Sequence, residues 1–130
     1  MPQREIEIIL SRQLASYLSM PIFIVDQVGT LVFYNEPAER ILGQRFDETG
    51  EMPPDEWVAA STATDDEGKA IPRERLPLMI ALTEKRPMHA HFWIVGDDNV
   101  RRRIATTAVP LVGQAGRHLG AMAIFWEAQA

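Results

Sequence analysis

Residues 21–43, with the sequence PIFIVDQVGTLVFYNEPAERILG, decide the fold. The first run, PIFIV, is β-branched and aromatic and predicts a strand. Gly29 lies in the following turn, where a positive φ is needed, and Leu31–Tyr34 predicts a second strand. Asn35 is a good N-cap for a short helix, and Gly43 marks the C-terminal end of that helix. The stretch therefore predicts a strand, a tight turn, a second strand and a short helix.

Length, composition and charge limit what the chain can be. Its 130 residues, 46% hydrophobic and 24% charged, fit one domain with a single core. The absence of cysteine excludes disulfides, thiolate nucleophiles and cysteine metal sites. A net charge of −5 argues against a nucleic-acid partner, because neutralising phosphates needs a positive surface. No signal-peptide core and no run of roughly 18 apolar residues is visible, so we expect a soluble, cytoplasmic protein without a membrane partner.

Residues 1–18 predict an N-terminal amphipathic helix. Its apolar residues recur with helical spacing and form one stripe, while charged and amide side chains occupy the other face. Such a stripe must be buried, either against the chain's own sheet or against a second copy of the chain, and the sequence leaves both open. The stripe consists of Ile6, Ile9, Leu10, Leu14, Tyr17 and Leu18.

The second half of the chain predicts a loop, a helix and three strands. Residues 44–72 are poor in periodicity and rich in Asp, Glu, Pro and Gly, which predicts a long loop. Residues 73–86 follow the 3.6-residue pattern of a helix that Pro87 ends. The last predicted strand is apolar on both faces, which is typical of a central strand covered on both sides. The three strands are predicted at Met88–Val95, Val100–Val112 and Leu119–Trp126, with a hairpin loop at 96–99.

This order of elements resembles that of PAS domains, over residues 19–127. An aspartate, a turn glycine, an asparagine and a helix-ending glycine recur at this spacing in the family. The segments LPL at 76–78 and AVPL at 108–111, with the run GAMAIF at 120–125, resemble later parts of it. The resemblance implies an α+β fold with a five-stranded antiparallel sheet in the order 2-1-5-4-3. Short helices would close one face around a small cavity, making 19–130 a PAS-like domain after the helix of residues 1–18.

The resemblance also implies a function. PAS domains are sensory and docking modules much more often than catalysts, so we expect a non-enzymatic domain of bacterial-type signal transduction. It would bind a small ligand or a partner protein, act as a homodimer and signal by population shift to an effector domain or signalling protein such as a kinase, phosphatase or transcription factor. A docking module whose cavity is filled by its own side chains remains an alternative.

Candidate site residues follow from the same resemblance. Residues on the elements that would face the cavity are candidates for a ligand pocket, and the helical stripe with two tryptophans is a candidate dimer interface. A carboxylate ligand could be oriented by Thr106, Thr107, Asn35 and the arginines at 101–103. The pocket candidates are Phe33, Asn35, Ile41, Phe46, Trp57, Met79, Leu82, Phe92, Thr106, Met122 and Ile124; the interface candidates are Ile6, Ile9, Leu10, Leu14, Tyr17, Trp93 and Trp126.

No resident cofactor is expected, although a small organic ligand such as a carboxylate or an apolar metabolite is compatible with the sequence. Light-sensing flavin PAS domains of the LOV type need a cysteine, which this chain lacks. Haem-binding PAS domains commonly use a histidine on the helix before the third strand, and residues 73–86 contain none. The resemblance therefore implies a PAS domain of a non-haem, non-LOV type.

Three histidines keep a second class of function open. His89 and His91 are two residues apart and share a face of a predicted strand. His118, at the start of the fifth strand, should lie at the same end of the sheet, roughly 10 Å away across two strand spacings. Three imidazoles could hold zinc there, so the alternative is a small metal-dependent enzyme or zinc-binding protein. No catalytic residue is predicted otherwise, because no serine lies in a nucleophile elbow and the paired aspartates lie in turns.

Overall fold

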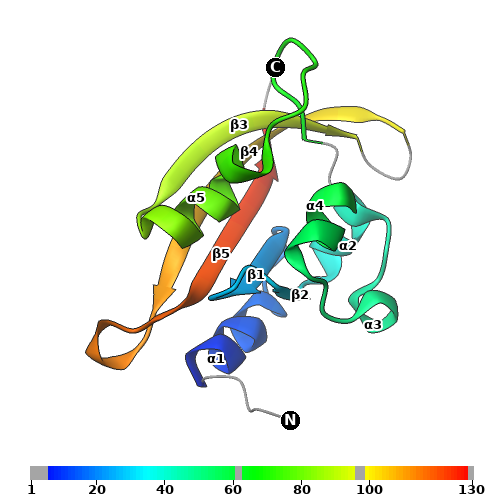
Figure 1. Cartoon of the computed structure of the whole chain (residues 1–130). Coiled ribbons are helices and arrows are strands. Elements are labelled where there is room, and N and C mark those ends of the chain that lie inside the picture. The colour runs from blue at the N-terminus through cyan, green and yellow to red at the C-terminus, as the bar shows by residue number, and fades with distance from the viewer. Residues whose placement is uncertain (1–5, 61–62, 96–98, 129–130) are drawn as a thin grey trace.

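The structure, a computed structural model, describes residues 6–60, 63–95 and 99–128, so most of the predicted 96–99 loop lies outside the described residues. Along these residues one helix is followed by two strands, four helices and then three strands (Figure 1). The helices are α1 (Ile6–Ala15), α2 (Glu36–Leu42), α3 (Phe46–Thr49), α4 (Pro54–Ala60) and α5 (Pro77–Glu84), with 3-10 turns at Arg73–Arg75 and Gln114–Gly116. The strands are β1 (Ile22–Asp26), β2 (Leu31–Tyr34), β3 (Met88–Val95), β4 (Arg101–Val112) and β5 (His118–Glu127).

Within these residues the strands form one antiparallel sheet in the order β2-β1-β5-β4-β3, which confirms the predicted order. β5 is central: Ala123 lies opposite Phe23 of β1 on one side and Ala108 of β4 on the other. The small side chains of Ala108 and Ala123 keep this part of β4 and β5 thin. Helices can therefore approach its surface closely.

The opening stretch folds as its residues predict. The Asp26 carboxylate accepts hydrogen bonds from the backbone N–H groups of Val28 and Thr30, both at 3.0 Å, and Gly29 has a φ of 92°. Gly43 ends α2 in the left-handed conformation, with a φ of 74°. These local contacts, available from a few neighbouring residues, explain why this segment was predictable.

The main core lies between one face of the sheet and the helices α2, α4 and α5. In Figure 1 α5 lies across β3, β4 and β5, while α2 and α4 lie towards β1 and β2. We call the side of the sheet that these helices cover the inner face. Its buried residues alternate along β1, β3, β4 and β5, as one covered face requires, whereas in β2 a shift in the pairing with β1 leaves Leu31 and Tyr34 three residues apart. They include Phe23, Val25, Leu31, Tyr34, Phe92, Ile94, Ile104, Ala108, Ala121 and Ala123.

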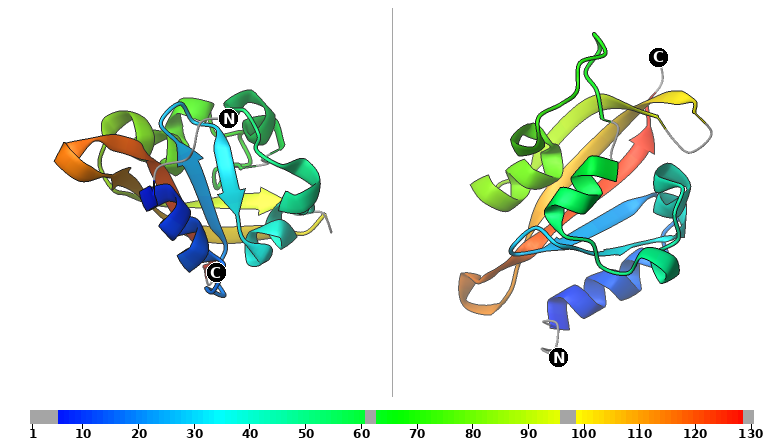
Figure 2. Two further views of the ribbon diagram at one scale, coloured as in Figure 1. Left: turned by 90° about the horizontal axis from the view of Figure 1, so that it is seen from below. Right: turned by 45° about the vertical axis from the view of Figure 1, so that its right-hand side comes forward.

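The helix α1 covers part of the opposite, outer face, beside β1 and β2 (Figure 2). Its buried residues are Ile8 and Ala15, which pack with Ile22, Ile24 and Val32. The predicted apolar stripe lies on the other side of the helix and points away from the sheet. The exposed fractions are 66% for Ile6, 48% for Ile9, 55% for Leu10, 58% for Leu14, 80% for Tyr17 and 39% for Leu18.

The orientation of α1 is accompanied by a contact between Arg12 and two aromatic rings. The guanidinium carbon of Arg12 lies 5.1 Å from the centroid of the Phe33 ring and 5.8 Å from that of Phe46. Arginine stacks well on aromatic faces, so this polar residue packs towards the sheet. The short side chain of Ala15 allows the C-terminal end of α1 to lie close to the sheet.

The segment predicted as a loop, residues 44–72, contains α3 and α4 and also protects both edges of the sheet. Leu31 of β2 exchanges two backbone hydrogen bonds with Met52, at 2.8 and 3.0 Å. Trp93 of β3 exchanges two with Thr64, at 2.8 and 2.9 Å. Exposed strand edges invite pairing with other chains, and these two bridges block such pairing where they form.

The predicted helix at 73–86 is divided in two. A 3-10 turn precedes α5, and Leu76 between them is extended, with a ψ of 137°. The ring of Pro77 disfavours the helical conformation at the residue before it, which explains the break. None of the helices in the described parts of the chain is long and apolar enough to cross a membrane.

Candidate functional site

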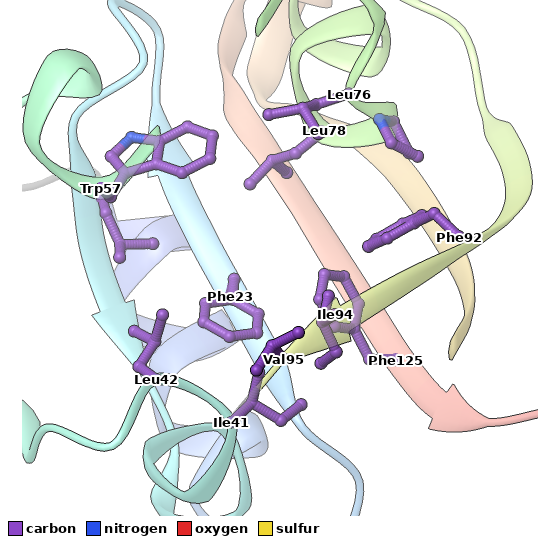
Figure 3. Close-up of a pocket in the computed structure, with 12 residues that line it drawn as sticks. Phe23, Ile41, Leu42, Trp57, Leu76, Leu78, Phe92, Ile94, Val95 and Phe125 are labelled. Atoms are coloured by element: carbon purple, nitrogen blue, oxygen red, sulfur yellow. The ribbon is translucent and has the colours of Figure 1, made fainter. Parts of the chain in front are cut away.

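A small apolar cavity lies between the inner face of the sheet and the helices, with a volume of about 70 Å³. Figure 3 shows side chains from the strands and the helices pointing towards the same space. The lining residues come from β1, β2, β3, β5, α2, α4 and α5 and the residues that flank them. They are Phe23, Leu31, Ile41, Leu42, Trp57, Leu76, Pro77, Leu78, Phe92, Ile94, Val95 and Phe125.

The side chains on the cavity wall offer no free polar group to a ligand. The one lining side chain with a polar atom is Trp57, whose indole Nε1 donates to the Gly29 carbonyl oxygen at 2.8 Å. Within the described residues, every buried side-chain nitrogen and oxygen has a hydrogen-bond partner. A polar ligand buried here would lose its hydrogen bonds to water and gain none from these side chains, so the cavity favours apolar groups.

The cavity is also small. An engineered cavity of about 150 Å³ that is lined by similar side chains holds benzene. The cavity here has about half of that volume, about 70 Å³. It therefore accommodates a narrow apolar group, such as part of an alkyl chain, without rearrangement.

The structure places three predicted pocket residues, Ile41, Trp57 and Phe92, on the cavity wall. Met79 is buried in the surrounding core and Leu82 packs against it, but neither lines the cavity. Thr106 does not line the cavity either, and its hydroxyl donates to the Ile124 carbonyl oxygen at 3.1 Å.

Four other pocket predictions were wrong about position. Phe33, Met122 and Ile124 pack in the cluster under α1, on the outer face. Phe46 lies beside the rings of Phe33 and Tyr34, both at 5.3 Å between centroids, and does not reach the cavity. In a strand, successive side chains point to opposite faces, so the composition of an apolar strand such as β5 does not reveal which set faces inward.

Asn35, also predicted for the pocket, is buried at 2% exposure and serves as a connection between elements. Its Oδ1 accepts from the N–H groups of Ile22 at 3.0 Å and Ala38 at 3.2 Å. Its Nδ2 donates to the carbonyl oxygens of Ala15 at 2.9 Å and Met20 at 2.8 Å. One amide therefore joins the start of β1, the start of α2 and the end of α1.

This connection links the cavity to the outer face of the sheet. The helix α2 carries Ile41 and Leu42 of the cavity wall, and its N-cap is Asn35. The same side chain holds the C-terminal end of α1. A ligand that displaced α2 would therefore act on the amide that fixes α1.

The histidine alternative gains no support. Among the residues that the structure describes, no three His, Cys, Asp or Glu side chains lie close enough to hold a metal ion. His89 instead lies with its Nδ1 2.9 Å from the Thr107 hydroxyl on the neighbouring strand. His91 is exposed on β3, the strand of His89, and His118 is the first residue of β5.

The predicted interface residues fall into two groups. The stripe residues of α1 and Trp126, which is 42% exposed, are open to a partner. Trp93 already has contacts within the chain: its Nε1 donates to Asp66 at 2.8 Å, and the Arg101 guanidinium carbon lies 4.1 Å from its ring centroid. Trp93 therefore attaches the 63–71 turn to β3.

Comparisons with known proteins agree with this architecture. No family model and no curated protein matches the sequence. Among solved structures, the PAS domain of Bordetella pertussis BvgS superposes with a TM-score of 0.63 at 13% identity, covering 95% of this chain and 87% of that one. The PAS domain of nitrogen regulation protein NR(II) from Vibrio parahaemolyticus gives 0.61 at 15% identity, covering 92% and 98%. The chain has the PAS fold.

The PAS-fold neighbours include LOV proteins as well. The Rhodobacter sphaeroides LOV protein superposes with a TM-score of 0.71 at 13% identity, covering 96% of this chain and 69% of that one. The predicted restriction to a non-LOV type is therefore not decided by the fold. It depends on chemistry: this chain has no cysteine with which a flavin could form a thiol adduct.

Proposed function

We propose that this PAS-fold chain is a sensory and protein-interaction module of signal transduction, without catalytic activity of its own. It binds a small molecule with an apolar body in the inner cavity and passes the change in packing to a kinase, phosphatase or transcription factor. The observation that carries the proposal is the cavity itself, which is lined by apolar side chains and adjoins the helix that Asn35 connects to α1.

The proposed ligand is diffusible and no cofactor is resident. None of the three histidines lines the cavity, so an axial ligand for haem is missing there. A flavin ring system needs hydrogen-bond partners at its polar edge, and the side chains of the cavity wall provide none in a volume of about 70 Å³. A narrow apolar group, such as part of an alkyl chain, needs neither an axial ligand nor hydrogen-bond partners from the cavity wall.

We also propose that a second copy of the chain covers the exposed stripe of α1. Four large apolar side chains of this short helix, and Tyr17 just after it, are about half exposed or more, while the buried residues of the helix are Ile8 and Ala15. Burying such side chains is worth about 1.5–3 kcal/mol each when it is complete. Pairing of the stripe with itself around a two-fold axis is the simplest arrangement that buries it.

Native mass spectrometry of the freshly purified chain tests the ligand and the subunit count together. The proposal expects a dimer that retains a small molecule or takes up an added apolar probe such as 1-octanol, one per chain. Leu42→Trp should fill the cavity and abolish uptake, whereas Val28→Trp, at a position 68% exposed in the β1–β2 turn, should not. An empty chain that takes up no probe would contradict the ligand part.

Size-exclusion chromatography with light scattering tests the dimer separately. Leu10→Glu and Leu14→Glu should give monomers, because each places a charge in the buried interface. Val28→Glu, which adds the same charge at an exposed apolar residue away from α1, should leave the dimer intact. A monomeric unmodified chain, or a dimer unaffected by either α1 variant, would refute this interface.

A further inference from the structure

A groove of about 430 Å³ adjoins the inner cavity. Three residues, Ile41, Ile94 and Phe125, line both spaces, so the groove lies directly beside the cavity, and we call it the mouth of the cavity. These three apolar side chains extend the wall of the cavity into the groove, towards the end of the sheet where β5 finishes. The other groove residues are Pro21, Arg40, Arg102, Ile104, Trp126 and Glu127.

Two arginines stand at this mouth. Arg102 lies opposite Ile94 in the β3–β4 register and two residues from Ile104, so it belongs to the inner, otherwise mostly apolar, face. Arg40 is in the last turn of α2, next to Ile41. A charged side chain at a position that alternates with core residues is unusual, because the rest of that face is chosen for burial.

Both arginines have carboxylate neighbours that a ligand could replace. The Nε of Arg102 lies 3.2 Å from Glu127, and Arg40 lies 3.8 Å from Glu36. The two glutamates are 67% and 82% exposed. Ion pairs this open to water are worth about 0–1 kcal/mol, so exchange of one carboxylate for another costs little.

We propose that the cavity and the groove form one site for an amphipathic monocarboxylate, with its apolar body in the cavity and its carboxylate between Arg40 and Arg102. This inference rests on the proposed sensory function and specifies the ligand class. Guanidinium groups bind carboxylates through paired hydrogen bonds. Arg40 and Arg102 offer two guanidinium groups at the groove, and their neighbours Glu36 and Glu127 are exposed enough for a ligand carboxylate to replace them.

The test compares octanoate with 1-octanol, which has the same alkyl chain and no charge. We expect octanoate to bind about tenfold more tightly, equivalent to about 1.4 kcal/mol. Arg40→Gln and Arg102→Gln should each weaken octanoate several-fold and leave 1-octanol unchanged, while Arg102→Lys should retain part of the preference. Arg103→Gln is the matched control, because Arg103 lies opposite Trp93 on the other face of β4. Isothermal calorimetry on folded variants, checked by circular dichroism, gives the affinities.

The outcomes separate this inference from the proposed function. If both compounds bind equally and neither arginine variant changes octanoate affinity, the carboxylate site is refuted while the apolar cavity stands. If neither compound binds, both proposals fail. A loss of octanoate affinity in Arg103→Gln equal to that in Arg102→Gln would also refute the site, because the effect would then reflect net charge alone.

Discussion

Asn35 shows how much one buried amide can organise. Its side chain makes four hydrogen bonds to backbone groups of Ala15, Met20, Ile22 and Ala38. The sequence predicted its role as an N-cap, because that signal is local. Its bonds to the end of α1 were not predictable, since they depend on how α1 lies on the sheet.

Replacing Asn35 with aspartate should separate the two halves of this connection. Aspartate keeps an oxygen that accepts from Ile22 and Ala38 but replaces the donor to Ala15 and Met20 with a second acceptor. We expect a loss of about 2–3 kcal/mol in the free energy of unfolding, measured with urea. Hydrogen exchange should accelerate in α1 more than in α2. Equal acceleration in both helices would contradict the assigned roles of the two amide atoms.

Gly120 should tolerate no side chain. A Cβ built at this residue, which has a φ of 151°, overlaps with the carbonyl oxygen of Val25 on β1. Gly120→Ala should therefore cost about 3 kcal/mol or more in the free energy of unfolding. Gly116→Ala is the matched control: its φ is 71° with nothing within 4 Å, so only the backbone penalty of about 1–2 kcal/mol applies. Similar losses in the two variants would show that β1 and β5 do not approach this closely.

Tyr34 should make stability fall at alkaline pH. Burial raises the pKa of its hydroxyl above 10.0, and the carboxylates of Glu39 and Glu48 add to this rise. The folded state therefore favours the neutral phenol. Its contribution is complete below pH 10 and is lost as the pH rises above that value, because the unfolded chain ionises first.

Urea unfolding between about pH 8 and about pH 11 checks this pKa effect. Tyr34→Phe should lower stability at neutral pH, since the hydroxyl bonds with Gln44 and Thr49, but should show a shallower alkaline decline. Tyr17→Phe, at a residue 80% exposed, should keep the original slope. The account is wrong about Tyr34 if all three proteins decline in parallel.

At the scale of elements, the helix α1 shows the limit of a periodicity argument. Spacing predicted a helix over residues 1–18, and the described residues form one at Ile6–Ala15, which ends before Tyr17 and Leu18 of the predicted stripe. Spacing could not predict that the stripe faces away from the sheet, because that depends on Arg12 meeting the rings of Phe33 and Phe46. The same limit applies to β5, where both faces are apolar and the sequence leaves their direction open.

Two substitutions in α1 should have different signatures. Ile8→Ala should cost about 2–4 kcal/mol in the free energy of unfolding at any protein concentration, because Ile8 is 2% exposed within one chain. Ile9→Ala, at a residue 48% exposed, should cost little in dilute solution and progressively more at higher concentration, where the proposed dimer forms. Thermal unfolding over a hundredfold range of concentration distinguishes them. A concentration-independent loss for Ile9→Ala would place this residue in the monomer's own core.

Across the whole molecule, the sheet order was predictable only through the resemblance to PAS domains, which the fold confirms. Strand positions were predictable from the residues alone, since alternation and turn chemistry are local signals. The two short helices in residues 44–72 and the division before Pro77 were not, because few residues define each of them. The cavity was predicted in outline. Its lining, and the arginines at its mouth, depend on register and on the packing of α2.

The central claim is that occupancy of the inner cavity is coupled to the packing of α1 through Asn35. Hydrogen exchange of α1, measured by mass spectrometry with and without saturating octanoate, tests this claim most directly. We expect ligand binding to change exchange in residues 6–15 as well as in α2, and expect Asn35→Asp to remove the change in α1 while α2 still responds. Binding that alters α2 but leaves exchange throughout α1 the same in the unmodified chain would contradict the account.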